Sequence, residues 1–391
     1  MFLNFIHDEL ERLKGEGLYR ELRVIIEGEQ GGVVKIDGRE IILLSSNNYL
    51  GLASHPELKR AAALAIERYG CGSGASRLIS GNMELHERLE EDIAAFKKTE
   101  SALLFNSGYT ANLGVISSIC GKGDVIFSDK LNHASIVDGC LLSGAEVKRY
   151  PHRDMDILER FLKNSSGFKK RVIITDGVFS MDGDIAPIRE IVHLAKMYSA
   201  FVIVDDAHAT GVFGKNGRGT TEHLGLNNGI DIIIGTFSKA LGSFGGFAAG
   251  VKKIKEFLIN RARGFMYTTS LPPSVLASSI AAIKIIENGH GLRDSLWKNV
   301  GYFKEGLKNM GFDIMGSESH IIPVFVGDNH KTVEMSQMLL KEGVFVQGIR
   351  PPTVPSGKSR LRVTVTAVHR MEDMDRALEI FHKVGKKFGI V

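Results

Sequence analysis

Cysteine, long apolar runs and clustered charge are the features of which this sequence has little. Its 391 residues include three cysteines, Cys71, Cys120 and Cys140, and no Cys-x-x-Cys pair. A disulfide framework is therefore not expected, and a reducing compartment fits. No apolar run approaches the roughly 20 residues that a membrane-spanning helix needs. The opening segment, MFLNFIHDELERLKGEG, mixes acidic and basic side chains where a signal peptide would have an apolar core, so we expect a cytoplasmic protein that does not bind membranes.

Charge is nearly balanced along the chain. Lysine and arginine number 49 against 45 aspartates and glutamates, a net charge of +4 without a basic block. Because a nucleic-acid-binding surface needs clustered positive charge, we expect no nucleic-acid partner. With 43% hydrophobic and 24% charged residues, the composition is that of an ordinary globular protein with a large core.

Short apolar runs alternate with amphipathic stretches and predict an α/β fold. The predicted strands are SALLF (101–105), DVIFSD (124–129), RVIIT (171–175), FVIVDD (201–206) and DIIIGTF (231–237). Helices are predicted at 84–98, at 186–199 and after Lys239. Strands that are apolar throughout and separated by helices imply a doubly wound, mostly parallel sheet covered on both faces.

The pattern changes near residue 286. A long helical stretch at 292–311 is followed by shorter predicted strands and by a last helix at 371–389. This order of predicted elements indicates a smaller α+β domain at 286–391, a large domain at 46–285 and an N-terminal arm at 1–45.

Polar residues collect where the predicted parallel strands end. NSGYTAN, NHAS and DGVFSMDGD follow the first three strands, and DDAHATG and TFSK end the last two. Because ligands of parallel α/β sheets bind outside the carboxyl ends of the strands, these segments predict a site at one edge of the sheet. In NSGYTAN, the strand-to-helix turn at Ser107, Gly108 and Tyr109 suits a phosphate, although a plain helix cap explains the same residues.

Asp205 and His208 lie three residues apart in VDDAHATG. A metal site is one interpretation, but two such residues without further ligands indicate it only weakly. A second interpretation makes Asp205 a buried anion held for a cationic partner such as a protonated heterocyclic nitrogen, because burial penalises an uncompensated carboxylate. A third is that Asp205 caps the next turn.

Lys239, in GTFSKALGSFGG, has three possible interpretations: a solvated charge at a strand end, the lysine of a loop that binds nucleotide phosphates, or a covalent catalyst. The nucleotide loop requires glycines before the lysine, whereas here they follow it. CGSG (71–74) fails as a dinucleotide fingerprint, since Arg77 stands where a third glycine or alanine is needed. An imine-forming lysine, an aspartate for a pyridinium nitrogen and a helix start for a phosphate are together the parts that a pyridoxal phosphate (PLP) enzyme needs.

Several long segments resemble the α-oxoamine synthases, fold-type I PLP enzymes that join an amino acid to an acyl-CoA with loss of CO₂. The matching segments run nearly end to end: SSNNYLGL (45–52), GSGASRLISG (72–81), LNHASIVDG (131–139), TDGVFSMDGDIAP (175–187), VDDAHATGVFGKNGRG (204–219), GTFSKA (235–240), YTTSLPP (267–273) and RPPTVPSGKSRLRVTVTAVH (350–369). The resemblance implies a large PLP-binding domain, a smaller C-terminal domain and a homodimer that shares its active sites.

The resemblance also implies roles for residues at the matching positions. Lys239 would hold PLP covalently and move the α-proton, and Asp205 would keep the pyridine nitrogen protonated. His133 would stack on the ring and reach the substrate, while His208 and Ser180 would contact the phenolic oxygen. These roles make Lys239, His133, Asp205 and His208 the catalytic group, with no metal.

The phosphate and substrate residues follow in the same way. The phosphate would bind Gly108, Tyr109, Thr236 and, from a second subunit, Thr269. The substrate would meet Asn47, Arg362, Thr353 and Arg20, the first two at its carboxylate. The alternatives are that His133 and His208 are core histidines and that Arg362 is a strand-edge charge.

The substrates differ among family members. GIRPPTVPSG and YTTSLPP look most like members that condense pimeloyl-CoA with L-alanine in biotin synthesis, whereas EGLYRE and KVGKKFGIV look more like members that condense acetyl-CoA with glycine. The first pair is our prediction; the alternatives are the second pair and the use of both pairs by one enzyme. A catalytically silent partner subunit is an alternative of another class, against which the presence of Lys239, His133, Asp205 and His208 argues.

Overall fold

A computed structural model describes residues 2–30, 32–226 and 228–391, which form two compact units. The larger unit consists of Leu52–Ser180 and Ile185–Arg293, and the smaller unit of Met1–Gly51, Met181–Asp184 and Asp294–Val391. The division into domains predicted from the sequence stays a prediction. None of the described helices is long and apolar enough to cross a membrane.

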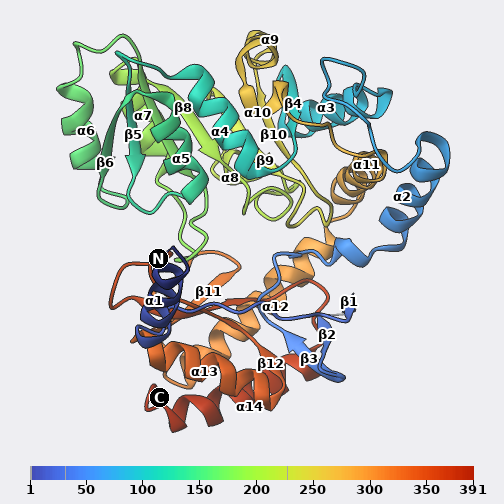
Figure 1. Ribbon diagram of the computed structural model, residues 1–391, viewed down its shortest axis with the longest axis vertical. Helices are drawn as coiled ribbons and strands as arrows, with labels where there is room; N and C mark the ends of the chain where they lie inside the picture. The colour runs from blue at the N-terminus through green and yellow to red at the C-terminus, as the bar shows by residue number, and fades with distance from the viewer. Residues whose placement is uncertain (1, 31, 227) are drawn as a thin grey trace. The chain divides into compact units, whose positions relative to one another are not determined.

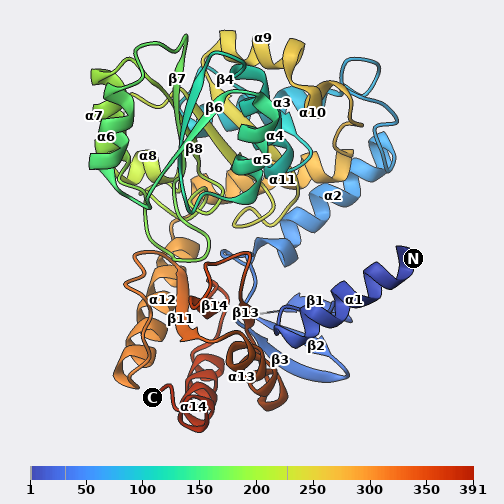
Figure 2. The same ribbon diagram turned by 60° about the vertical axis from the view of Figure 1, so that its left-hand side comes forward.

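A seven-stranded sheet forms the centre of the larger unit (Figures 1 and 2). Its strands, in spatial order, are β4 (Ser101–Phe105), β10 (Gly246–Gly250), β9 (Ile232–Thr236), β8 (Phe201–Asp205), β7 (Arg171–Asp176), β5 (Val125–Asp129) and β6 (Glu146–Tyr150). Strand β10 is antiparallel to both of its neighbours, and the other pairs are parallel. The predicted mostly parallel α/β sheet is confirmed.

Helices cover both faces of this sheet, and this explains why its strands are apolar throughout. On β7, Val172 and Ile174 belong to one buried cluster, whereas Ile173 between them belongs to another. Successive side chains of a strand point to opposite faces, so a strand with two covered faces needs apolar residues at every position. The first cluster includes residues of α4 (Gly108–Ile119), α5 (Ala134–Ser143), α9 (Lys252–Arg261) and α10 (Arg263–Met266), and the second includes residues of α6 (Met155–Lys163) and α7 (Ile188–Met197). The remaining helices of the unit are η1 (Leu52–Ser54), α2 (Pro56–Tyr69), α3 (Glu84–Lys97), α8 (Thr220–His223) and α11 (Pro273–Asn288).

The prediction of a helix after Lys239 is wrong. The chain instead turns back through residues 240–245 into β10, a strand that the sequence did not indicate because it reads GFAAG. A Cβ on Gly246 would lie 2.5 Å from the Ser107 oxygen and 2.6 Å from the Gly108 nitrogen. Glycine is therefore required where β10 passes the start of α4. Strand β6 was also missed, because its sequence EVKRY lies at the sheet edge and is only partly buried.

The smaller unit contains two sheets. The first has the order β1 (Glu27–Gln30), β2 (Val33–Ile36), β3 (Arg39–Leu43) and β12 (Val344–Phe345), and the second has β11 (Ile321–Gly327), β14 (Ser359–Thr364) and β13 (Gln347–Ile349). Strand β3 pairs in parallel with β12, so the N-terminal segment forms one sheet with the C-terminal part. The helices are α1 (Phe2–Gly15), α12 (Gly291–Asn309), α13 (Asn329–Glu342) and α14 (Met371–Lys387), of which α13 and α14 lie side by side (Figure 1).

Candidate active site

Lys239 and His208 meet at the carboxyl ends of β9 and β8. The two strands are parallel neighbours, and the turns that follow them bring Lys239 Nζ to 2.8 Å from His208 Nε2. His208 is buried and Lys239 is half-buried. A lysine in this position is not a fully solvated strand-end charge, and its amine has a histidine nitrogen within proton-transfer distance.

Asp205 is the last residue of β8 and is 5% exposed. Its carboxylate accepts hydrogen bonds from Asn112 Nδ2 at 2.6 Å and from the Ala207 N–H at 2.9 Å, both neutral donors. Asp205 forms no ion pair within the part of the chain that the structure describes. The described residues also contain no group of three or more His, Cys, Asp and Glu side chains that could hold a metal ion. This arrangement suits a buried anion that awaits a cation from a ligand.

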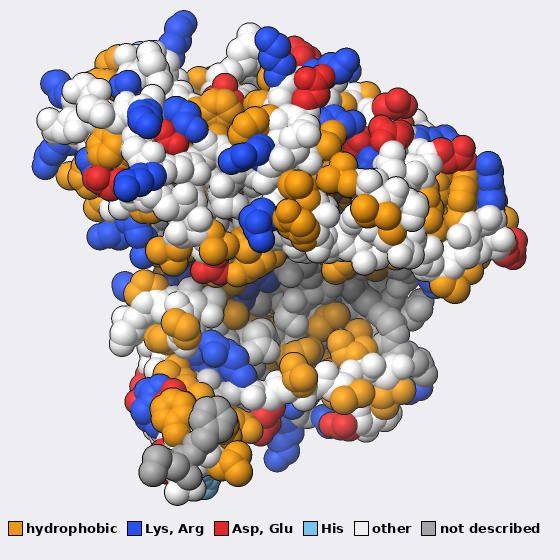
Figure 3. Space-filling view, turned by 45° about the horizontal axis from the view of Figure 1, so that its top comes forward, with side chains coloured by type: hydrophobic (Ala, Val, Ile, Leu, Met, Phe, Trp, Pro, Cys, Tyr) orange, Lys and Arg blue, Asp and Glu red, His pale blue; other side chains and the backbone are white. Residues whose placement is uncertain are grey.

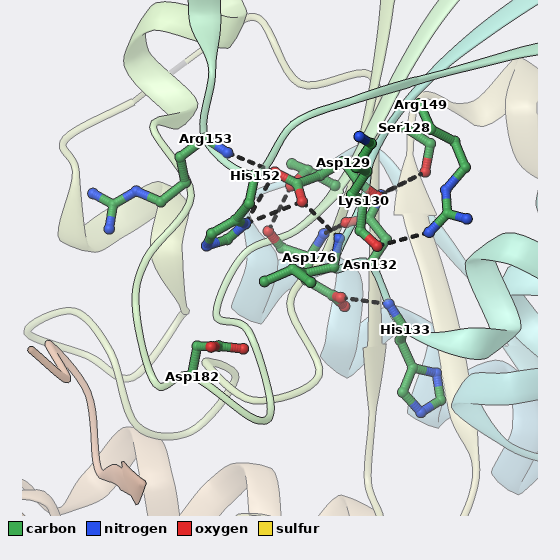
Figure 4. Close-up of polar contacts among 12 residues, drawn as sticks. Ser128, Asp129, Lys130, Asn132, His133, Arg149, His152, Arg153, Asp176 and Asp182 are labelled. Carbon is green, nitrogen blue, oxygen red and sulfur yellow. Dashed lines mark hydrogen bonds and ion pairs between the residues drawn. The ribbon is translucent and has the colours of Figure 1, made fainter. Parts of the chain in front are cut away.

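His133 is the N-cap of α5, and its exposed side chain extends away from a buried polar network (Figure 4). Its backbone N–H donates to Asp176 Oδ2 at 2.7 Å, and Asp176 lies beside Asp205 in the register of β7 and β8. Burial, together with the nearby Asp205 carboxylate, raises the pKa of Asp176 well above its ordinary value, although the His133 N–H opposes this shift. The Asp129 carboxylate fixes the loop that leads into α5, because it accepts hydrogen bonds from the backbone N–H groups of Leu131 and Arg153.

The start of α4 lies next to the end of β9. Ser107 caps the helix by accepting the Thr110 N–H at 3.0 Å, so the plain cap is present. A Cβ on Gly108 would lie 3.5 Å from the Thr236 Cβ, which brings two of the predicted phosphate residues together. The Tyr109 hydroxyl hydrogen-bonds Asp138, and Thr269 is exposed.

The residues of the larger unit fit PLP. A carboxylate held by neutral donors matches a pyridinium nitrogen, a half-buried lysine matches the aldehyde carbon, and a helix start beside Thr236 matches a phosphate. Ser180, which lies at the end of a segment of this unit, is half-buried.

Arg362 lies on β14 in the smaller unit, at 7% exposure. Strand β14 is the middle strand of its sheet, so Arg362 is not a strand-edge charge. Its guanidinium donates to Asn47 Oδ1 at 3.1 Å and to the Tyr49 hydroxyl at 3.4 Å. The structure therefore brings together the two residues predicted to bind the substrate carboxylate.

Arg20 and Thr353 flank one exposed turn of the same unit. Arg20 Nη2 donates to the Pro351 carbonyl at 3.4 Å, and the Thr353 N–H donates to the Arg350 carbonyl at 3.2 Å. Both residues are exposed. Their predicted contacts with a substrate stay predictions.

Sequence reasoning missed four residues that contact the predicted ones: Asn112, Ser135, Asp176 and Tyr49. Each lies inside or beside a segment that was predicted to contribute to the site, such as NSGYTAN or NHAS. Their residue types alone carried no signal, because buried Asn, Ser, Asp and Tyr side chains serve many structural purposes.

Comparisons with known proteins agree on one family. The family model described as "Aminotransferase class I and II" matches residues 39–381. Proteins named 8-amino-7-oxononanoate synthase from Citrifermentans bemidjiense and Geotalea daltonii are 58% and 57% identical to 98% of this chain, and the matches cover 99% and 98% of those proteins.

Solved structures give the same result. A serine palmitoyltransferase variant from S. paucimobilis, with a bound PLP–myriocin aldimine, matches with a TM-score of 0.95 and 35% identity over 99% of this chain and 98% of that one. An 8-amino-7-oxononanoate synthase from Francisella tularensis matches with a TM-score of 0.77 and 30% identity over 90% of this chain and 99% of that one.

Proposed function

Because the chain belongs to the α-oxoamine synthases, within the class I and II aminotransferases, we propose that it is a PLP-dependent acyltransferase. It condenses L-alanine with pimeloyl-CoA and releases CoA, CO₂ and 8-amino-7-oxononanoate, a step of biotin synthesis. The observation that carries this choice of substrates is the 58% identity, over 98% of the chain, to a protein named for that product.

Each residue of the larger unit has a defined task in this proposal. Bound PLP supplies an electron sink for negative charge at the α-carbon of the amino acid. Lys239 Nζ holds the cofactor and takes and returns the α-proton, and His208, 2.8 Å away, orients that amine. Asp205 would compensate the positive pyridine nitrogen, His133 would contact the ring and Ser180 the phenolic oxygen. Gly108, Tyr109 and Thr236 hold the phosphate.

The substrate carboxylate is assigned to Arg362 and Asn47. A guanidinium binds a carboxylate through two parallel hydrogen bonds, which fixes the direction of the bond that breaks on loss of CO₂. Tyr49, whose hydroxyl donates to Asn47 Oδ1 at 2.9 Å, holds the asparagine in place. Thr353 and Arg20 are assigned to the path of the acyl-CoA.

A homodimer in the cytoplasm completes the proposal, with Thr269 reaching the phosphate of the second subunit. Large hydrophobic side chains exposed on the larger unit support an interface: Leu78, Ile79, Leu141, Leu142 and Tyr267. On the face shown in Figure 3, hydrophobic side chains gather in patches between charged ones. Single exposed apolar residues are ordinary, but grouped ones indicate a surface that another chain covers.

The substrate choice is tested by CoA release from three pairs: pimeloyl-CoA with L-alanine, acetyl-CoA with glycine, and palmitoyl-CoA with L-serine. We expect the highest kcat/KM for the first pair. A preference for the second would move the assignment to glycine C-acetyltransferase, and a preference for the third to serine palmitoyltransferase. Turnover of none by PLP-loaded protein would favour the silent subunit.

The covalent role is tested by Lys239→Ala, which removes both the attachment point and the proton carrier. We expect turnover to fall by roughly 100- to 10,000-fold, the range for loss of a general acid–base group. Borohydride reduction followed by mass spectrometry of peptides should label Lys239 in the wild type only. Lys253→Ala, at an exposed lysine of α9, is the matched control and should keep full turnover. A label on any other lysine would contradict the assignment.

A further inference from the structure

A continuous set of hydrogen bonds joins His133 to Asp205 inside the larger unit. His133 Nδ1 lies 2.8 Å from Ser135 Oγ in the first turn of α5. Ser135 Oγ lies 2.9 Å from Asn112 Nδ2 on α4, and the same nitrogen lies 2.6 Å from Asp205 Oδ2. Asn112 and Ser135 are 1% and 0% exposed, so bulk water cannot substitute for either of them.

The chemistry of Asn112 sets the direction of these bonds. Its amide nitrogen only donates, and an ionised Asp205 only accepts. The reversed amide would place Asn112 Oδ1 against the carboxylate, where two acceptors repel each other. The observed orientation instead leaves Oδ1 buried without a hydrogen-bond partner among the described residues. Since an unpaired buried polar atom costs about 1–3 kcal/mol, the bond to Asp205 decides the orientation.

The direction continues to His133. Because Ser135 Oγ accepts from Asn112, the hydroxyl proton of Ser135 is available for His133 Nδ1. The Ser135 backbone N–H also donates to Nδ1, at 3.3 Å. Two donors therefore point at the same ring nitrogen, which must be unprotonated. The single proton of the neutral imidazole then lies on Nε2.

We propose that Asn112 and Ser135 are positioning residues, which couple the ionised Asp205 to His133 and hold its ring as the neutral tautomer with a proton on Nε2. The use of that tautomer rests on the proposed function, in which His133 lies against the cofactor and presents Nε2–H to the substrate. The tautomer itself is a property of the folded chain alone and is measurable without cofactor.

The test is long-range proton–nitrogen correlation NMR on cofactor-free protein labelled with ¹⁵N-histidine. The chain has 13 histidines, and the His133 signals are assigned as those that disappear in His133→Asn. We expect wild-type His133 to show an unprotonated Nδ1 and a protonated Nε2. A protonated Nδ1 in the wild type would overturn the proposal.

Two variants test the coupling. In Ser135→Ala the hydroxyl donor is lost, and we expect His133 to populate both tautomers. Asn112→Asp replaces the donor amide by an acceptor of the same shape, so the Ser135 hydroxyl donates its proton to residue 112. The Ser135 oxygen is then free to accept a hydrogen bond from His133 Nδ1. We therefore expect His133 to shift to the tautomer with a proton on Nδ1. Unchanged His133 signals in both variants would also overturn the proposal.

Activity provides a second measurement and separates this inference from the function. Ser135→Ala should lower kcat roughly 10- to 100-fold with a smaller change in KM, as is found when partners that orient a functional histidine are removed. Ser117→Ala on α4, whose hydroxyl donates to the Leu113 carbonyl at 2.5 Å, is the control and should leave the tautomer and turnover unchanged. If the wild-type protein lacks turnover but His133 shows the expected tautomer, and this tautomer changes in the two variants, the proposed function is refuted and the inference stands. Normal turnover with an unresponsive His133 refutes only the inference.

Discussion

Asp205 and Asp206 are adjacent buried carboxylates with opposite surroundings. Asp206 is 0% exposed and forms an ion pair with Lys97 at 2.9 Å, supported by the hydroxyl and N–H of Thr220. Among the described residues, the donors to Asp205 are the neutral groups of Asn112 and Ala207. The fold therefore neutralises the charge of one aspartate internally, whereas the other has no cation beside it among the described residues, as our proposal requires.

Strand β14 of the smaller unit carries two buried arginines, Arg360 and Arg362. Arg360 is 2% exposed and pairs with Asp182 at 2.6 Å, whereas Arg362 donates to the neutral oxygens of Asn47 and Tyr49. Because a buried charge must be compensated, we expect Asp205, which has no cationic partner among the described residues, to meet a cation of the cofactor. The four predictions below test this distinction.

The largest effect is expected for Lys97→Met, which leaves Asp206 as a buried charge without its cation. Breaking a buried ion pair from one side costs about 3–5 kcal/mol, so the free energy of unfolding should fall by that amount in urea titrations. Lys98→Met, at the exposed neighbouring lysine, is the control and should change little. An unchanged unfolding free energy in Lys97→Met would contradict the assignment of Asp206 to a structural ion pair.

The next effect is expected for Asp205→Asn, which keeps the shape but removes the charge. Turnover should fall at least about 100-fold, in the range seen when one group that stabilises transition-state charge is lost. The unfolding free energy of cofactor-free protein should change less than in Lys97→Met, because Asp205 forms no ion pair with the residues that the structure describes. Equal losses of stability in the two variants would show that both aspartates are structural.

A smaller effect is expected for Arg362→Lys, which keeps the positive charge and loses the two-pronged hydrogen bond. The KM for L-alanine should rise roughly tenfold, since a hydrogen bond to a charged group contributes about 1.5–3 kcal/mol. Arg360→Lys, on the same strand, should alter urea unfolding without a selective change in this KM. A selective rise in this KM for Arg360→Lys, with a change in stability alone for Arg362→Lys, would assign the substrate carboxylate to Arg360 instead.

The smallest effect is a pH dependence from Asp176, whose pKa burial and the Asp205 carboxylate raise well above 3.8. The folded protein keeps a proton there that the unfolded chain releases above about pH 4. Stability from this group is therefore lost as pH rises from about 4 toward the raised pKa. Asp176→Asn removes that loss, so its unfolding free energy relative to wild type should rise over the same interval. A flat difference across that interval would contradict the assignment.

Much of the larger unit was predictable from local sequence. The apolar runs that became β4, β5, β7, β8 and β9 are buried on both faces, and such burial imposes a hydrophobic residue at every position. Polar residues after these runs were predicted to share one edge, because parallel strands end on the same side. Lys239 and His208 do meet there.

Other elements have no local signature. Strand β10 is composed of glycine and alanine because it passes close to Ser107 and Gly108, and β6 is polar because it lies at an edge. The sequence indicated a helix after Lys239, and the antiparallel return to β10 replaces it.

Hydrophobic patterning and the matching segments were enough to predict the class of fold, a candidate site at the strand ends and the family to which the chain belongs. Which buried charges pair with each other depends on contacts that form in the folded chain. Lys97 finds Asp206 across 109 positions of sequence, and Asn112 finds Asp205 across 93. The physical reason is that hydrophobic patterning acts between neighbours along the chain, whereas the partner of a buried charge depends on which distant strand or helix packs beside it.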